Sequence, residues 1–135
     1  MYRILLPLDD SKERARKQAD YAAGLPCAEE SVVAVLAHAL TDEEREVPEA
    51  MQRVDRVETV RRTADRLEEE GVEYETRELS SPPAEGILDL VAEEDIEEVV
   101  MGGRKRSPAE KAILGSVTQT VILNADVPVT VTGGE

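Results

Sequence analysis

The sequence predicts a three-layer α/β sandwich built on a parallel sheet. Short apolar segments that suit buried strands alternate along the chain with longer segments that suit helices. Strands separated by helices of about ten residues or more pair in parallel through right-handed crossovers, with helices on both faces of the sheet. A chain of 135 residues with 41% hydrophobic content suits one domain, so we expect residues 1–135 to form a single unit.

The first strand and helix are predicted from residues 2–26. Residues 2–8 form an apolar run that is typical of a fully buried strand. Asp10 and Glu13 have the spacing of a capping box at the start of the next helix, and Gly24 with Pro26 predicts its end. Small apolar residues share one face of this helix: Ala15, Ala19 and Ala22.

The middle of the chain predicts a strand at residues 31–39 and an exposed acidic loop at residues 41–49. A long amphipathic helix is expected at residues 49–70, and Gly71 is expected to end it. The apolar residues that face the core in this helix are expected to be Val54, Val57, Ala64 and Leu67.

The remaining elements complete the sandwich. Residues 72–79 alternate polar and apolar side chains, as an edge strand does, and Ser81-Pro82-Pro83 predicts the start of a third helix. The apolar residues of that helix are Ala84, Ile87, Leu88 and Val91. A strand at residues 97–101, a helix at residues 116–124 and a strand from Val127 to Thr132 follow.

The composition argues against several classes of protein. Thirty acidic residues against 16 basic ones give a net charge of -14, which disfavours binding to nucleic acid or to a membrane surface, since both are polyanions. This acidic composition suggests a halophilic protein that stays soluble in strong salt, where the repulsion between its charges is screened. No segment suits a membrane span and the first residues lack the features of a signal peptide, so we expect a cytoplasmic protein.

The lone cysteine and the lone histidine limit the chemistry further. Cys27 has no partner for an internal disulfide, and with only His38 beside it the chain lacks the ligands of a zinc site. We interpret Cys27 as a buried or incidental thiol and His38 as a packed or capping group. No catalytic residue and no protein metal site is predicted.

The most informative segment begins where an apolar strand runs into Gly102-Gly103-Arg104-Lys105-Arg106. Further along, Gly115-Ser116-Val117-Thr118 resembles the opening of a helix. Glycines let the backbone approach a ligand, and a helix N-terminus presents unpaired N–H groups and positive potential, so this layout suits an anion. If the strand order reverses between the first and fourth strands, residues 7–11 share the same crevice.

Three stretches resemble the universal stress protein family, over essentially the whole chain. They are Ile4-Leu5-Leu6-Pro7-Leu8-Asp9-Asp10-Ser11, Pro83-Ala84-Glu85-Gly86-Ile87-Leu88, and the segment from Val100 through Gly115-Ser116 to Thr130. The resemblance implies a strand order of 3-2-1-4-5 in an adenine nucleotide alpha hydrolase-like fold. It also implies a homodimer paired through the strand from Val127 to Thr132 and, in one branch of the family, bound ATP.

That branch carries the pattern Gly, two residues, Gly, nine residues, Gly, then Ser or Thr. Here Gly102, Gly115 and Ser116 fit the pattern, but Lys105 occupies the second glycine. A lysine at a position that requires a positive φ strains the backbone, whereas its ammonium group would favour phosphate binding. Shape therefore argues against nucleotide binding at Lys105, and charge argues for it.

The resemblance implies that Asp9 accepts hydrogen bonds from the ribose or the adenine, and that backbone near Pro7 and Ala39 walls the base. The complete set of expected ligand residues is Pro7, Asp9, Ala39, Met101, Gly102, Arg104, Lys105, Gly115, Ser116, Val117 and Thr118. Ordinary roles remain open for some of them. Asp9, Ser116 and Thr118 could cap helices, and Gly102 could form only a turn.

The leading hypothesis is a regulatory or stress-response module that binds ATP, with Mg or Mn accompanying the nucleotide and an unknown signalling partner. One alternative is a dimeric universal stress protein that acts through protein interaction without a nucleotide, which Lys105 favours. A second is an ATPase in which Arg104 or Lys105 stabilises the transferred phosphate. Its turnover is expected to be slow, because no Walker-type Lys-Ser/Thr pair and no general base stands out. A binder of flavin or another adenine derivative is the weakest alternative.

Overall fold

The computed structural model describes residues 1–39, 57–103 and 114–133. The elements within these ranges are β1 (Tyr2–Pro7), α1 (Lys12–Ala23), α2 (Ala28–Ser31), β2 (Val32–His38), α3 (Glu58–Glu69), β3 (Glu73–Glu78), α4 (Pro83–Glu93), β4 (Glu98–Met101), α5 (Ser116–Asn124) and β5 (Val129–Val131).

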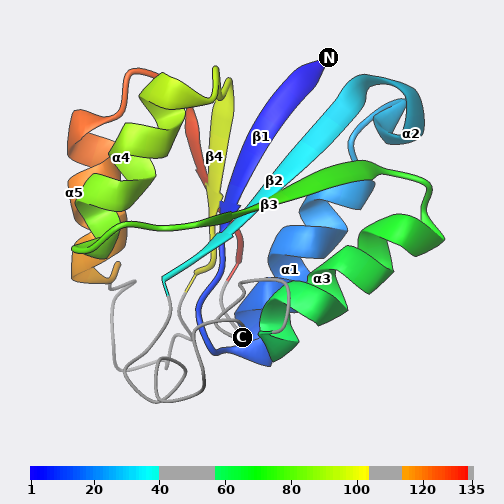
Figure 1. Ribbon diagram of the computed structural model, residues 1–135, viewed down its shortest axis with the longest axis horizontal. Coiled ribbons are helices and arrows are strands. Elements are labelled where there is room, and N and C mark those ends of the chain that lie inside the picture. The colour runs from blue at the N-terminus through cyan, green and yellow to red at the C-terminus, as the bar shows by residue number, and fades with distance from the viewer. Residues whose placement is uncertain (40–56, 104–113, 134–135) are drawn as a thin grey trace.

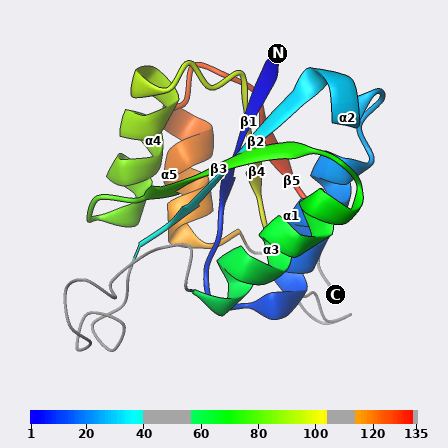
Figure 2. The ribbon, with the colours of Figure 1, turned by 45° about the vertical axis from the view of Figure 1, so that its right-hand side comes forward.

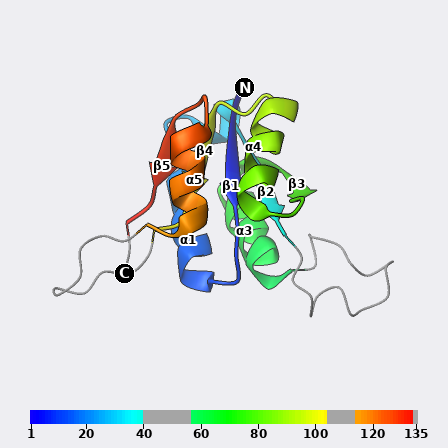
Figure 3. The same ribbon diagram turned by 90° about the vertical axis from the view of Figure 1, so that its left-hand side faces the viewer.

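The strands form one five-stranded parallel sheet in the order β3-β2-β1-β4-β5, which confirms the predicted order (Figure 3). β1 pairs with β2 over its whole length, from Tyr2 opposite Val32 to Pro7 opposite Ala37. Its pairing with β4 is much shorter and joins only Ile4 to Glu98 and Leu5 to Val99. From β1 the chain adds β2 and β3 on one side of the sheet and then β4 and β5 on the other, so the strand order reverses between β1 and β4. The pairing of β1 with β4 ends before the carboxyl ends of the two strands.

Two helical layers cover the sheet, so the predicted three-layer sandwich is confirmed. α1 and α3 lie on one face, while α4 and α5 lie on the other (Figures 1 and 2). Alternation along β1 divides the core accordingly, because Ile4 and Leu6 point to the first face and Leu5 to the second. Among the described residues, no helix has the length and apolarity that crossing a membrane requires.

The start of α1 differs from the prediction. Ser11, not Asp10, is the N-cap residue, and its Oγ accepts a hydrogen bond of 3.2 Å from the backbone N–H of Arg14. The capping-box spacing of Asp10 and Glu13 is therefore one residue out of register with the cap that forms. The hydroxyl of Ser11, one residue later than Asp10, accepts a hydrogen bond from a backbone N–H of the first turn in the same way that an Asp10 cap would.

The limits of other helices and strands also differ from the prediction. The helix expected from residue 49 is described only from Glu58 (α3), with Val57 as its extended N-cap, and residues 41–56 lie outside the described ranges. The short helix α2 was not predicted; it follows Cys27, which is exposed and has a left-handed φ of 56°. β5 is shorter than the expected strand from Val127 to Thr132.

A buried carboxylate ties the edge strand β5 to the rest of the sheet. Glu98 on β4 is 5% exposed and accepts hydrogen bonds of 2.7 Å from the hydroxyls of both Tyr2 and Tyr21. The hydroxyl of Thr130 on β5 also donates to Glu98. β1, α1 and β5 therefore meet at one side chain, and hydroxyl groups rather than a cation solvate its charge.

Candidate functional site

A cavity of about 290 Å³ opens beyond the carboxyl ends of β1, β2 and β4, where the strand order reverses. Ligands of open α/β sheets bind at this position. Of the eleven residues expected to contact a ligand, all that fall within the described ranges line the cavity: Pro7, Asp9, Ala39, Met101, Gly102, Gly115, Ser116, Val117 and Thr118. The other two, Arg104 and Lys105, lie outside the described residues.

The N-terminus of α5 contributes one wall of this cavity. Its N-cap is Gly115, which has extended backbone (φ -63°, ψ 160°) and makes no side-chain capping bond. The first turn contains no acidic residue. Ser116 and Thr118 therefore do not cap this helix, and the positive end of its dipole lies at the cavity with no carboxylate in the first turn of the helix itself.

Three buried polar side chains hold the loop that follows β1. The Gln18 Nε2 donates to the carbonyl of Pro7 (2.8 Å), and the Thr59 hydroxyl donates to the carbonyl of Asp9 (2.7 Å). Between them, the Nδ1 of His38 lies 2.8 Å from the carbonyl oxygen of Leu8. A carbonyl only accepts, so Nδ1 carries the hydrogen in this contact.

The exposed fractions of Gln18, His38 and Thr59 are 1%, 2% and 3%. Because each one contacts a different carbonyl of three successive residues, the loop has little freedom to move. The prediction that His38 is a packed group is confirmed, and its contact with Leu8 gives it a definite task. The backbone that carries Asp9 is thereby held in place before any ligand arrives.

The carboxylate of Asp9 is already engaged by two neighbours. Its Oδ1 accepts a hydrogen bond of 2.8 Å from the backbone N–H of Ser11. Its Oδ2 lies 3.0 Å from the Nε and 2.9 Å from the Nη2 of Arg14. Asp9 thus braces the start of α1 while its carboxylate remains half-exposed at the cavity.

Gly102 has a steric reason to be glycine. A Cβ at this position would lie 2.8 Å from the Cβ of Arg14 and 3.1 Å from its Cδ. Its φ lies outside the left-handed region, so close packing against the Arg14 stem, not backbone conformation, excludes a side chain.

Leu8 and Asp10 line the cavity, as expected for residues 7–11, but several other lining residues were not predicted from the sequence: Arg14, Gln18, His38, Leu79, Pro83 and Ile87. For Gln18 a signal was present. It lies on the buried face of α1 with Ala15, Ala19 and Ala22, at the helical spacing of an apolar stripe. A polar residue within such a stripe needs buried partners, and here the partners are the carbonyls at the site.

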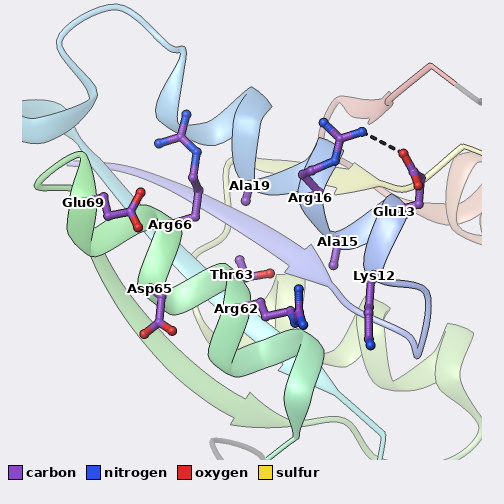
Figure 4. Close-up of a pocket in the computed structure, with 10 residues that line it drawn as sticks. All are labelled: Lys12, Glu13, Ala15, Arg16, Ala19, Arg62, Thr63, Asp65, Arg66 and Glu69. Atoms are coloured by element: carbon purple, nitrogen blue, oxygen red, sulfur yellow. Dashed lines mark hydrogen bonds and ion pairs between the residues drawn. The ribbon is translucent and has the colours of Figure 1, made fainter.

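A larger cavity of about 450 Å³ lies between α1 and α3, away from the ends of the strands (Figure 4). Its floor is formed by Ala15, Ala19 and Thr63, and its rim is charged. The cations of this rim already have carboxylate partners: Arg16 with Glu13, Arg62 and Lys12 with Glu58, and Arg66 with Asp20 and Glu70. Ion pairs within the protein therefore already engage the cations around this groove, so its charges give no reason to infer a ligand there.

No group of three or more His, Cys, Asp or Glu side chains in the described part of the chain could hold a metal ion. These residues therefore do not fit a metal held by the protein alone.

The family model for "Universal stress protein family" matches residues 1–133. The chain belongs to the universal stress protein family. This membership agrees with the parallel sheet, its reversed strand order and the cavity at the reversal.

Solved structures of universal stress proteins share the fold. A universal stress protein from Archaeoglobus fulgidus is 30% identical, with a TM-score of 0.78 over 98% of this chain and 99% of its own. One from the same organism in complex with dAMP is 24% identical (TM-score 0.66, 98% of both chains). A family protein from Arabidopsis thaliana with AMP bound is 14% identical (TM-score 0.69, 100% of this chain and 93% of its own). Comparison with curated proteins gives no match.

Proposed function

We propose that this universal stress protein binds an adenine nucleotide, ATP, at the cavity beyond β1 and β4 and acts as a cytoplasmic regulatory or stress-response module. One observation carries the proposal. The uncapped N-terminus of α5 and the rigid loop that holds Asp9 line the same cavity, although more than a hundred residues separate them in the chain.

The two walls suit the two ends of a nucleotide. Apolar side chains of Leu79, Ile87 and Met101 line the cavity together with Pro7 and Ala39, and such a surface suits an adenine ring. The half-exposed carboxylate of Asp9 accepts hydrogen bonds, which suits ribose hydroxyls.

The other wall suits phosphate. The first-turn N–H groups at Ser116, Val117 and Thr118 belong to a helix end that lacks a cap, and such ends bind phosphate groups. A divalent ion would arrive with the phosphates, since the described residues do not fit a metal by themselves. The dAMP and AMP complexes of the Archaeoglobus and Arabidopsis proteins support an adenine nucleotide as the ligand class.

Titration calorimetry with ATP and magnesium tests this proposal. The sharpest variant is Ser116→Asp, which places a carboxylate at the helix N-terminus, stabilises the helix dipole and repels phosphate. We expect it to weaken ATP binding about 100-fold without lowering the melting temperature. Thr120→Asp is the matched control, because this exposed residue lies on the same helix but does not line the cavity.

A nucleotide-free interaction protein is the second candidate function. The edge strand β5 and the exposed side chains of Ile122 and Leu123 on α5, 41% and 82% exposed, favour it. Self-pairing of β5 in a homodimer is compatible with either function. A folded protein that binds neither ATP nor AMP would contradict nucleotide binding and favour this candidate.

We propose in addition that the protein is adapted to high salt, because a net charge of -14 repels itself unless ions screen it. Transfer from molar salt to dilute buffer should lower its melting temperature. A melting temperature that does not change with salt would contradict the adaptation.

A further inference from the structure

Arg14 places a guanidinium group in the wall of the cavity. Within the described ranges, no other Lys or Arg side chain lines the cavity, whereas two carboxylates, Asp9 and Asp10, do. An anionic ligand that enters therefore meets more negative than positive side-chain charge on these walls. Among the described residues, Arg14 is therefore the side chain that can attract a phosphorylated ligand.

The stem of Arg14 lies directly over Gly102, the residue at which β4 passes into the segment expected to bind phosphate. The positions of three of its side-chain carbons, Cβ, Cγ and Cδ, are within 3.2 Å of where a Cβ of Gly102 would be. Because Gly102 has no side chain, the stem of Arg14 can pack against its backbone. Arg14 therefore lines the same cavity as Gly102 and the N-terminal residues of α5, Ser116 to Thr118.

Donor groups of Arg14 remain available for a ligand. Its Nε and Nη2 contact the Oδ2 of Asp9, and its Nη1 has no hydrogen-bond partner among the described residues. The side chains of Arg14 and Asp9 are 34% and 56% exposed, so water screens their ion pair and a phosphate competes well with it. A guanidinium fork binds phosphate through two parallel hydrogen bonds.

We propose that Arg14 binds a phosphate of the ligand and thereby selects phosphorylated adenine nucleotides over adenosine. This inference rests on the proposed function, because it assigns a specificity-determining residue to the same cavity. The Asp9 carboxylate holds the guanidinium in the absence of ligand, and the phosphate takes over part of that role. Asp9 is then released toward the ribose.

The test compares AMP with adenosine by titration calorimetry. Arg14→Gln should weaken AMP binding about tenfold and leave adenosine binding within about twofold, because one charge-assisted contact is lost. Arg14→Lys keeps the charge and should retain most of the preference for AMP. Arg16→Gln is the matched control, since it removes the same charge from the same helix on the side that faces the groove between α1 and α3.

The outcomes separate the two proposals. An equal loss for AMP and adenosine in a folded Arg14→Gln protein would overturn the inference, because Arg14 would then act only by orienting Asp9. An undiminished affinity for AMP would overturn it as well. If the wild-type protein binds neither ligand, the proposed function itself fails and the role of Arg14 falls with it. Melting curves of each variant establish that the fold is intact.

Discussion

Gln18 and Val100 lie 82 residues apart in the chain, and the Gln18 Nε2 donates a hydrogen bond of 2.9 Å to the Val100 carbonyl oxygen. The same amide group donates to the carbonyl of Pro7 at the end of β1. β1 and β4 pair only through Ile4–Glu98 and Leu5–Val99, before Pro7 and Val100, so the neighbouring strand supplies no donor to these two carbonyls. One side chain on α1 therefore bridges the gap from which the cavity opens.

Replacing Gln18 with Leu should destabilise the protein by about 2–4 kcal/mol, because two buried carbonyls lose their donor. The measurement is the free energy of unfolding in urea. Gln119→Leu is the control, because the Gln119 side chain is exposed and donates to the carbonyl of Leu114, which lies outside the core. A loss below about 1 kcal/mol at Gln18 would show that the bridge does not hold the strands.

The carboxylate of Glu98 should make stability sensitive to acid. Burial raises the pKa of Glu98, but hydrogen bonds from Thr130, Tyr2 and Tyr21 outweigh it and hold this pKa below its usual value of 4.5. The stabilisation is therefore fully present above pH 4.5 and is lost as the pH falls through the lower pKa of the folded state.

The variant Glu98→Gln isolates this contribution. We expect it to lower the free energy of unfolding by about 1–3 kcal/mol at neutral pH, and by much less once the carboxylate of the wild-type protein is protonated. Urea unfolding at several pH values measures the difference. Glu93→Gln, on the exposed side of α4, should show no such pH-dependent difference.

Tyr2 should produce the opposite dependence at high pH. Burial and the hydrogen bond to Glu98 raise the pKa of the Tyr2 hydroxyl to about 12. Its unfolded value is 10.0, so the stabilisation is complete below that pH and is lost between pH 10 and 12. Tyr2→Phe should flatten the fall of the melting temperature in this range. An equally steep fall in the wild-type protein and the variant would contradict this role of Tyr2.

Gly86 on α4 should not tolerate a methyl group. A Cβ there would lie 2.3 Å from the carbonyl oxygen of Ser80, which is backbone and cannot rotate away. Alanine stabilises a helix relative to glycine by only about 1 kcal/mol, which is less than the cost of this steric clash. We therefore expect Gly86→Ala to destabilise the protein by about 3 kcal/mol. Thermal melting measures this effect, with the exposed neighbour Glu85→Ala as a control. An equal melting temperature for both variants would contradict the packing argument.

The proposed homodimer can be tested without disturbing the β4–β5 ladder. The N–H of Thr132 donates to the carbonyl of Met101, so by alternation the N–H of Val131 points away from β4. Val131→Pro removes this outward donor and should yield monomers in sedimentation analysis, while the melting temperature of the isolated domain stays nearly unchanged. A dimer that survives this substitution must pair through another surface.

Much of the fold could be predicted because its signals are local. The spacing of apolar residues indicates most strands and helices. The limits of α5 are as predicted, with Gly115 directly before its first residue and Asn124 as its last. The boundary errors occur where two residues could each serve as a cap, as with Asp10 and Ser11. Such choices depend on packing that the local sequence does not contain.

The sequence by itself determined the alternation of strands and helices, the acidic character of the chain and the segments that supply Asp9 and Gly115 to one site. Only the tertiary structure decided what these residues contact. The steric need for Gly102 and the role of Gln18 arise between residues distant in the chain. The pairing of Asp9 with Arg14 joins residues five positions apart, but it depends on how the loop after β1 leads into α1. The physical reason is that hydrogen bonds and close contacts depend on distances in space, which exist only after the sheet and helices have packed.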